Sequence, residues 1–226
     1  MLADLKLRLQ RLPELQNIAA QGALFQQFHQ KAKKARCMAI EADTALRVAA
    51  HGLDEFDGKQ AAATVRYAAQ RAQRLYDRIK ATPEIVADRK TEASFIKLVE
   101  DSEKARRECL AAWSGLIQRK LSGRSALANV VVQILPSKGA LLRRAVRTLT
   151  EATERLPAKE ADVTTVREAL DNFDGTLKDL GWSEAIDAFL QAAAERRAVP
   201  RELDKPEIRA FLDQHNLWDA FQIGLK

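Results

Sequence analysis

The chain has 226 residues, of which 46% are hydrophobic and 30% charged, and its formal net charge at pH 7 is +6. This balance is typical of a folded globular protein and excludes an intrinsically disordered chain. Aromatic residues make up only 6% while alanine is abundant, which favours helices packed through small side chains over an aromatic-rich β-sandwich.

Three long helices are predicted first along the chain. Apolar and small residues recur at alternating steps of three and four, which is the periodicity of amphipathic helices. These registers run from Leu24 to Ala49, from Ala61 to Ile79 and from Phe95 to Leu116, each with an average step of about 3.5 residues. Such patterns occur in antiparallel bundles and coiled coils. We expect an elongated antiparallel helical array over residues 1–121, with its first helix at 23–51.

The predicted helices after residue 121 are shorter and carry larger apolar side chains. The most apolar stretch, ALANVVVQIL at 126–135, is too short and too polar to cross a membrane, and a buried helix fits it better than a strand. Further registers run from Leu142 to Leu156 and from Val166 to Leu180. The sequence therefore predicts an all-α protein with a more compact helical region at 122–226. A single continuous domain is the alternative to this division.

Motifs for catalysis, cofactors and metals are missing from the sequence. The three histidines lie in separate segments, with no second His at i+4 and no Glu three residues before any of them. The chain also has no P-loop and no nucleophile elbow. Cys37 and Cys109 form no CxxC pair, which indicates small buried residues in a reducing compartment. Because charges interrupt every turn of MLADLKLRLQRL, it does not resemble a signal peptide. We expect a cytoplasmic protein with no cofactor, no metal and no membrane association.

Charge is distributed unevenly along the chain. Residues 1–150 have a net charge of +12 and residues 151–226 one of −6, which together give the total of +6. From Cys109 to Thr150, a run of 42 residues, there is no Asp or Glu. This run predicts a surface that contacts the phosphates of nucleic acid or another polyanion, and pairing with the acidic half of the chain is the alternative. The candidate polyanion-binding residues are Arg119, Lys120, Arg124, Lys138, Arg143, Arg144 and Arg147.

The C-terminal sequence DQHNLWDAFQIGLK, at 213–226, contains five large apolar side chains. Exposing them to water is unfavourable, so we predict that residues 217–225 are ordered, with Trp218 and Phe221 packed near the helix that contains Phe189. The alternative is a segment that docks on another protein. Ile223 and Leu225, which we expect to be less buried than Trp218 and Phe221, would then be available to the partner. The candidate protein-docking residues are Trp218, Phe221, Ile223 and Leu225.

Two classes of function fit these patterns. The first is a non-catalytic helical adaptor or accessory subunit of a cytoplasmic multiprotein complex, acting through protein–protein contacts. The alternative is a helical nucleic-acid-binding protein that contacts the phosphate backbone through the basic surface at 119–147, without sequence selectivity. An enzyme with dispersed catalytic residues is the least favoured class. A protein partner is expected in the first case, and the heptad patterns are also compatible with a homo-oligomer.

Overall fold

The computed structural model describes residues 2–82, 85–86, 88–194 and 200–218, and within these ranges it contains helices and no strand. The predicted all-α fold is confirmed. The elements in chain order are α1 (Leu2–Gly52), α2 (Lys59–Ala81), α3 (Arg89–Leu121), α4 (Arg124–Ile134), α5 (Pro136–Thr153), α6 (Glu160–Asp179), α7 (Glu184–Ala194), the 3₁₀ helix η2 (Pro200–Asp204) and α8 (Pro206–His215).

Packing divides the chain into two compact units, Met1–Trp113 and Ser114–Lys226, which we call unit 1 and unit 2. The division falls inside α3, so this helix contributes its first part to unit 1 and its last turns to unit 2. The predicted boundary after residue 121 coincides instead with the end of α3, where Gly123 adopts a positive φ of 79° before α4 begins.

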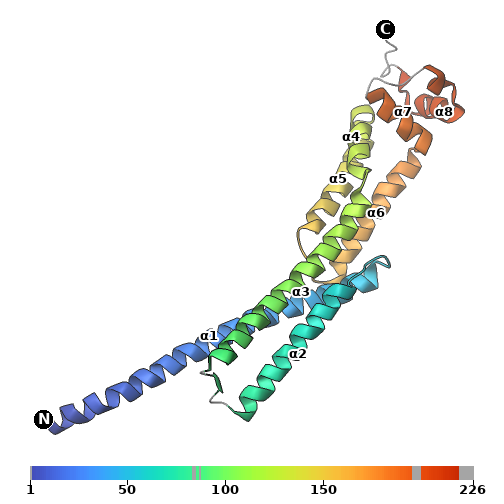
Figure 1. Ribbon diagram of the computed structural model, residues 1–226. Helices are drawn as coiled ribbons and strands as arrows, with labels where there is room; N and C mark the ends of the chain where they lie inside the picture. The colour runs from blue at the N-terminus through green and yellow to red at the C-terminus, as the bar shows by residue number, and fades with distance from the viewer. Residues whose placement is uncertain (1, 83–84, 87, 195–199, 219–226) are drawn as a thin grey trace. The chain divides into compact units, whose positions relative to one another are not determined.

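Unit 1 consists of α1, α2 and the first part of α3, and consecutive helices run in opposite directions (Figure 1). Many of its buried side chains are small, and one described cluster holds Phe28 and Phe95, whose rings stack with centroids 4.7 Å apart. The predicted registers are confirmed, because their positions supply this core. The buried small residues are Ala35, Ala42, Ala45 and Ala49 of α1, Ala61 and Ala68 of α2, and Ala105 and Cys109 of α3.

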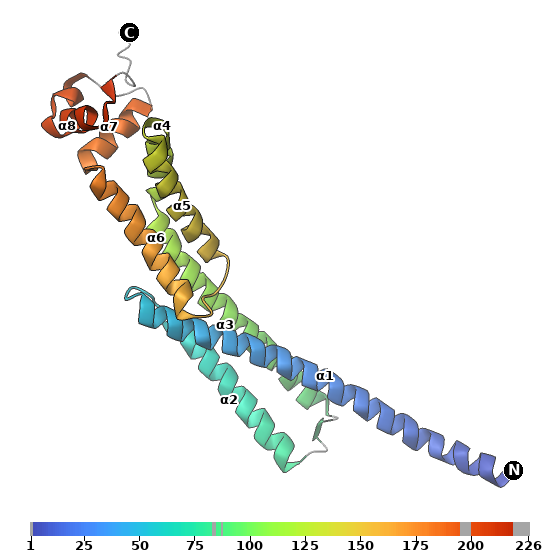
Figure 2. The ribbon, with the colours of Figure 1, turned by 180° about the vertical axis from the view of Figure 1, so that it is seen from behind.

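The first part of α1 extends beyond its neighbours. In Figures 1 and 2 it continues as a helix past the ends of α2 and α3. Leu24 and Phe28 are the first residues of α1 found in a hydrophobic cluster among the described side chains. The helix predicted at 23–51 therefore begins much earlier, at Leu2, and ends at Gly52.

Unit 2 has a core of larger apolar residues. Residues 129–134 lie in α4 and are helical, as predicted. One hydrophobic cluster of unit 2 joins α7 and α8, which lie together in Figure 1, and includes Leu217 beyond the end of α8. In α5, Gly139 is buried, and a Cβ atom there would meet the backbone of Val132 in α4. The cluster consists of Ile186, Phe189, Leu190, Ile208, Phe211, Leu212 and Leu217.

Two helices of unit 2 end in the same type of C-terminal motif. Gly181 follows α6 with φ 67°, and Asn216 follows α8 with φ 56°. The amide of Trp182 donates to the Leu177 carbonyl at 3.0 Å, and the amide of Leu217 donates to the Leu212 carbonyl at 2.9 Å. These are the backbone bonds of Schellman motifs, in which the residue after the left-handed position turns back onto the helix. Both motifs thereby direct an apolar side chain toward the cluster of unit 2.

Candidate functional site

Two of the seven basic residues predicted to bind a polyanion form ion pairs with acidic residues of unit 2. Arg124 Nη2 donates to Asp174 Oδ1 at 2.8 Å and to Oδ2 at 3.0 Å. Arg147 Nε donates to Glu151 Oε1 at 2.7 Å, and this hydrogen bond raises the pKa of the arginine. Both acids belong to the acidic part of the chain, so the internal pairing considered as an alternative occurs at these two positions.

Three other basic residues of this set remain exposed on α5. Lys138, Arg143 and Arg144 form no ion pair with any acidic residue in the described part of the chain. Arg143 and Arg144 lie on the solvent side of α5, away from the face that buries Leu142 and Leu149. Of the remaining two, Arg119 is exposed and Lys120 partly buried, both in the last turn of α3. The basic surface accessible to a polyanion is therefore smaller than the sequence suggests.

The predicted docking residues are described only in part. Leu217, and not Trp218, is the residue that packs with Phe189, because the left-handed Asn216 turns residue 217 onto α8. Trp218 is 41% exposed, and its Nε1 donates to Asp213 Oδ1 at 2.6 Å. Trp218 is therefore not in the cluster around Phe189, near which it was predicted to pack, and its role in docking stays a prediction. Phe221, Ile223 and Leu225 lie outside the described residues.

A ladder of polar contacts joins α2 to α3 in unit 1. At its first rung, Gln60 Nε2 and Thr64 Oγ1 donate to the carboxylate of Glu108 at 3.2 and 2.6 Å. At its second rung, Arg71 Nε lies 2.7 Å from Oδ2 of Asp101, a residue only 7% exposed. Arg71 Nη2 also donates to the Tyr67 hydroxyl at 2.8 Å. Each rung thus pairs donors of α2 with a carboxylate of α3.

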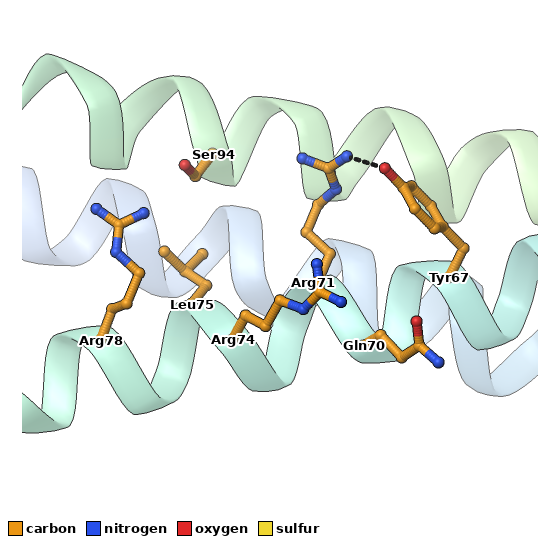
Figure 3. Close-up of a pocket in the computed structure, with 7 residues that line it drawn as sticks. All are labelled: Tyr67, Gln70, Arg71, Arg74, Leu75, Arg78 and Ser94. Carbon is orange, nitrogen blue, oxygen red and sulfur yellow. Dashed lines mark hydrogen bonds between the residues drawn. The ribbon is translucent and has the colours of Figure 1, made fainter.

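A groove occupies the next position of this ladder (Figure 3). Glu108 and Asp101 are one heptad apart, and one heptad before Asp101 the α3 sequence has Ser94. Arg74 and Arg78 of α2 line the groove with Ser94, and its volume is about 380 Å³. We call it the arginine groove, which is lined by Tyr67, Gln70, Arg71, Arg74, Leu75, Arg78 and Ser94.

Sequence reasoning missed the arginine groove. Its one signal in the sequence is the spacing of Arg71, Arg74 and Arg78, which are three and four residues apart and so share one face of a helix. An acid-free run at 58–76 contains Arg71 and Arg74, but it ends at Asp77, before Arg78, and is shorter than the run at 109–150. Only the register between α2 and α3 shows that a serine lies where the neighbouring rungs have carboxylates.

The histidine and cysteine side chains described next belong to no metal-binding cluster within the described residues. His215 Nε2 lies 3.0 Å from the Leu180 carbonyl oxygen, and its ring contacts Phe211. Burial raises the pKa of the Cys109 thiol to about 11. The predicted burial of both cysteines is confirmed for Cys109 and wrong for Cys37, which is exposed. Within the described ranges, no three His, Cys, Asp or Glu side chains come together as metal ligands. No helix in the described part of the chain is both long and apolar enough to span a membrane.

No protein-family model matches the sequence, no curated protein is significantly similar to it, and no solved structure matches the fold at a significant level.

Proposed function

We propose that the protein is a non-catalytic helical adaptor of a cytoplasmic complex, which binds a helix of a partner protein along the first part of α1. The observation that carries this proposal is the position of that segment. α1 begins at Leu2, and Figures 1 and 2 show its first part continuing as a helix past the ends of α2 and α3. An isolated helix of this kind is only marginally stable in water, so a neighbouring helix would stabilise it.

The sequence of this segment indicates what kind of helix it fits. Leucines at 2, 5, 9 and 12 alternate steps of three and four, which are the a and d positions of a heptad. The flanking e and g positions include Lys6 and Arg8 and no acid. A second copy of the chain would bring further basic residues to the same seam. A partner helix with acidic residues beside its apolar seam is therefore favoured.

Pro13 limits the regular part of this seam. Proline lacks an amide hydrogen and its ring clashes with the preceding turn, which destabilises a helix interior by about 3 kcal/mol. The clean leucine register accordingly lies in residues 2–12, before the proline. Contact with a partner helix would offset this local penalty.

The experiment uses two synthetic leucine-heptad peptides of equal length, one with Glu and one with Lys at every e and g position. Binding of each peptide to the full-length protein is measured by calorimetry. We expect the Glu peptide to bind and the Lys peptide not to bind. The triple variant Leu5→Gln, Leu9→Gln, Leu12→Gln should lose this binding. Leu141→Gln, at a 52% exposed leucine of α5, is the matched control and should retain it.

Two outcomes would contradict the proposal. Equal binding of both peptides, or binding that survives the triple substitution, would show that the leucine seam does not select an acidic helix. Self-association detected by light scattering and lost in the triple variant would assign the segment to a second copy of the chain. A pull-down from the native host then identifies the partner as the protein recovered by the wild type and lost with the triple variant.

A nucleic-acid-binding function is the second candidate, and the exposed Lys138, Arg143 and Arg144 support it. The double variant Arg143→Gln, Arg144→Gln should lower the slope of log affinity against log salt for duplex DNA by about 1.8, because two phosphate contacts are lost. Arg106→Gln with Arg147→Gln is the control of equal charge, since both arginines already pair with carboxylates. Wild-type protein that shows no salt-dependent retention on DNA or heparin would remove this candidate.

A further inference from the structure

The third position of the α2–α3 ladder has cations but no carboxylate to pair with them. Arg74 and Arg78 both line the arginine groove, and neither forms an ion pair with a carboxylate of the described residues. Ser94, which replaces the carboxylate on α3, carries no charge and donates its hydroxyl to the Lys90 carbonyl at 2.7 Å. The two guanidinium groups are thus left without the anion that the other rungs provide from within the chain.

The neighbouring rung holds one wall of the groove in place. Arg71 is fixed from two sides, by the buried Asp101 carboxylate and by the Tyr67 hydroxyl. Its guanidinium also lies 5.1 Å from the centroid of the Tyr67 ring. Figure 3 shows Arg71 and Arg78 extending from α2 toward α3, with Leu75 and Ser94 between them along the groove. The charge of Arg71 is largely matched by Asp101, so the unmatched positive charge belongs to Arg74 and Arg78.

We propose that the arginine groove binds a phosphate group, which takes the place of the missing carboxylate between Arg74 and Arg78. Guanidinium groups suit this ligand because their planar N–H donors match phosphate oxygens in pairs. The groove volume of about 380 Å³ leaves room for a group attached to the phosphate. Tyr67, with half of its surface exposed, lies at the Arg71 end and offers an aromatic face to that group. This site is separate from the α1 segment and from the basic residues of α5.

Inorganic phosphate and organic phosphomonoesters share this chemistry, so the experiment uses both. Thermal unfolding of the full-length protein is followed in inorganic phosphate, in glycerol phosphate and in adenosine monophosphate, against chloride of equal ionic strength. We expect the wild type to be stabilised by phosphate and by the monoesters, with one site per chain by calorimetry. The affinity of adenosine monophosphate is compared with that of inorganic phosphate in the wild type and in Tyr67→Ala. If its affinity is higher in the wild type and equal to that of phosphate in Tyr67→Ala, the natural ligand carries a ring that contacts Tyr67. Equal binding would mean that the groove recognises the phosphate alone.

Three variants test the residues that make the site. Arg74→Gln with Arg78→Gln should abolish the phosphate-induced shift, whereas Arg143→Gln with Arg144→Gln, which removes the same charge from α5, should retain it. Ser94→Glu should restore a carboxylate at the third rung. It should therefore raise the melting temperature without phosphate and abolish the response to phosphate. This gain of stability keeps the test informative even if the arginine variants fold poorly.

An internal carboxylate is the rival explanation, and Glu84, which lies outside the described residues, is the nearest acid in the sequence after Arg78. Glu84→Gln should leave the phosphate response of the wild type intact or enlarge it. Absence of any phosphate response in the wild type would overturn the proposal. So would a phosphate response that survives both the double arginine variant and Ser94→Glu.

Discussion

The two units of this chain are held together by different kinds of side chain. In unit 1 many of the buried positions are small, and Ala42, Ala45, Ala49, Ala105 and Cys109 are all 0% exposed, although Trp113 at its end is also buried. In unit 2 the α7–α8 cluster is built from leucine, isoleucine and phenylalanine. Small residues allow helix axes to approach closely but remove little apolar surface from water. We therefore expect apolar burial to contribute more to the stability of unit 2 than to that of unit 1.

Unit 1 compensates with polar contacts of defined register. The α2–α3 ladder pairs Thr64 with Glu108 and Arg71 with Asp101, and Arg106 of α3 pairs with Glu41 of α1 at 2.8 Å. Exposed ion pairs add little stability, but an unpaired charge at a buried position is strongly unfavourable. The ladder thus selects one alignment of α2 against α3 among several that alanine seams would permit. Specificity in unit 1 comes from charge, and in unit 2 from the shape of large side chains.

The largest effect should follow from removing an aromatic anchor of unit 2. Phe211 is 2% exposed, and its ring meets Trp182 edge to face with centroids 5.6 Å apart. Phe211→Ala should lower the free energy of unfolding by about 3–5 kcal/mol, through lost apolar burial and the cavity left behind. Chemical denaturation measures it, with Leu141→Ala at an exposed site of the same unit as a control. If Phe211→Ala lowers the free energy of unfolding by less than the substitutions in unit 1 described below, large apolar side chains are not what distinguishes the stability of unit 2.

The second effect concerns the buried rung of the ladder. Asp101→Asn keeps the shape of the side chain but removes the charge that Arg71 faces, and should destabilise the protein by about 1.5–3 kcal/mol. Glu100→Gln, at an exposed neighbour on α3, is the control and should change stability by less than about 0.5 kcal/mol. Hydrogen exchange should show the loss of protection in α2 and α3. Unchanged protection there would mean that the alanine seams alone set the alignment.

A third substitution tests how closely the helices of unit 1 approach. Ala105 is 0% exposed, so Ala105→Leu must push α3 away from its neighbours and should destabilise by about 1–3 kcal/mol through overpacking. Ala111→Leu, at an exposed position of the same helix, provides the matched control. Circular dichroism during thermal unfolding follows both. Wild-type stability of Ala105→Leu would show that the seam has room for larger side chains.

The smallest effect concerns the reactivity of the two cysteine thiols of unit 1. Cys109 is 0% exposed and its thiol has a pKa of about 11, because burial disfavours the thiolate. At pH 8 iodoacetamide should therefore modify Cys37 and spare Cys109, as peptide mass spectrometry can show. Above the ordinary thiol pKa of 9.0 the unfolded chain loses this proton first, so stability should fall between about pH 9 and pH 11. Cys109→Ala should reduce that fall, and an equal fall in both proteins would assign it to other groups.

Periodicity was sufficient to predict the helices and most of their buried faces. Most of the positions from Phe95 to Leu116 that recur every three or four residues are buried in α3, as expected for a seam of small and apolar residues. The register did not predict the burial of Asp101, Trp113 and Ile117. The early start of α1 could not be predicted from the register that begins at Leu24. Gly22 and Pro13 lower helix propensity before that point.

The sites were harder to predict than the fold, for two physical reasons. Whether Leu217 or Trp218 enters the core depends on the backbone angle of one residue, and the sequence indicates only that Asn216 can end a helix. The arginine groove depends on which residue of α3 lies opposite Arg74 and Arg78. That register is set by tertiary packing between the two helices, so it cannot be predicted from the sequence of either helix alone.

The left-handed Asn216 has a stereochemical consequence. An L-residue at φ 56° brings its Cβ close to the following carbonyl oxygen, a strain of about 1–2 kcal/mol that asparagine tolerates better than most. For a D-amino acid the same angle is the relaxed one. A chain completed by ligation with D-alanine at 216 should therefore fold at least as stably as one with L-alanine, a reversal of the usual effect of inverting a stereocentre. The direction in which the chain leaves α8, and with it the burial of Leu217, thus depends on a backbone angle at residue 216 that the L configuration disfavours and the D configuration favours.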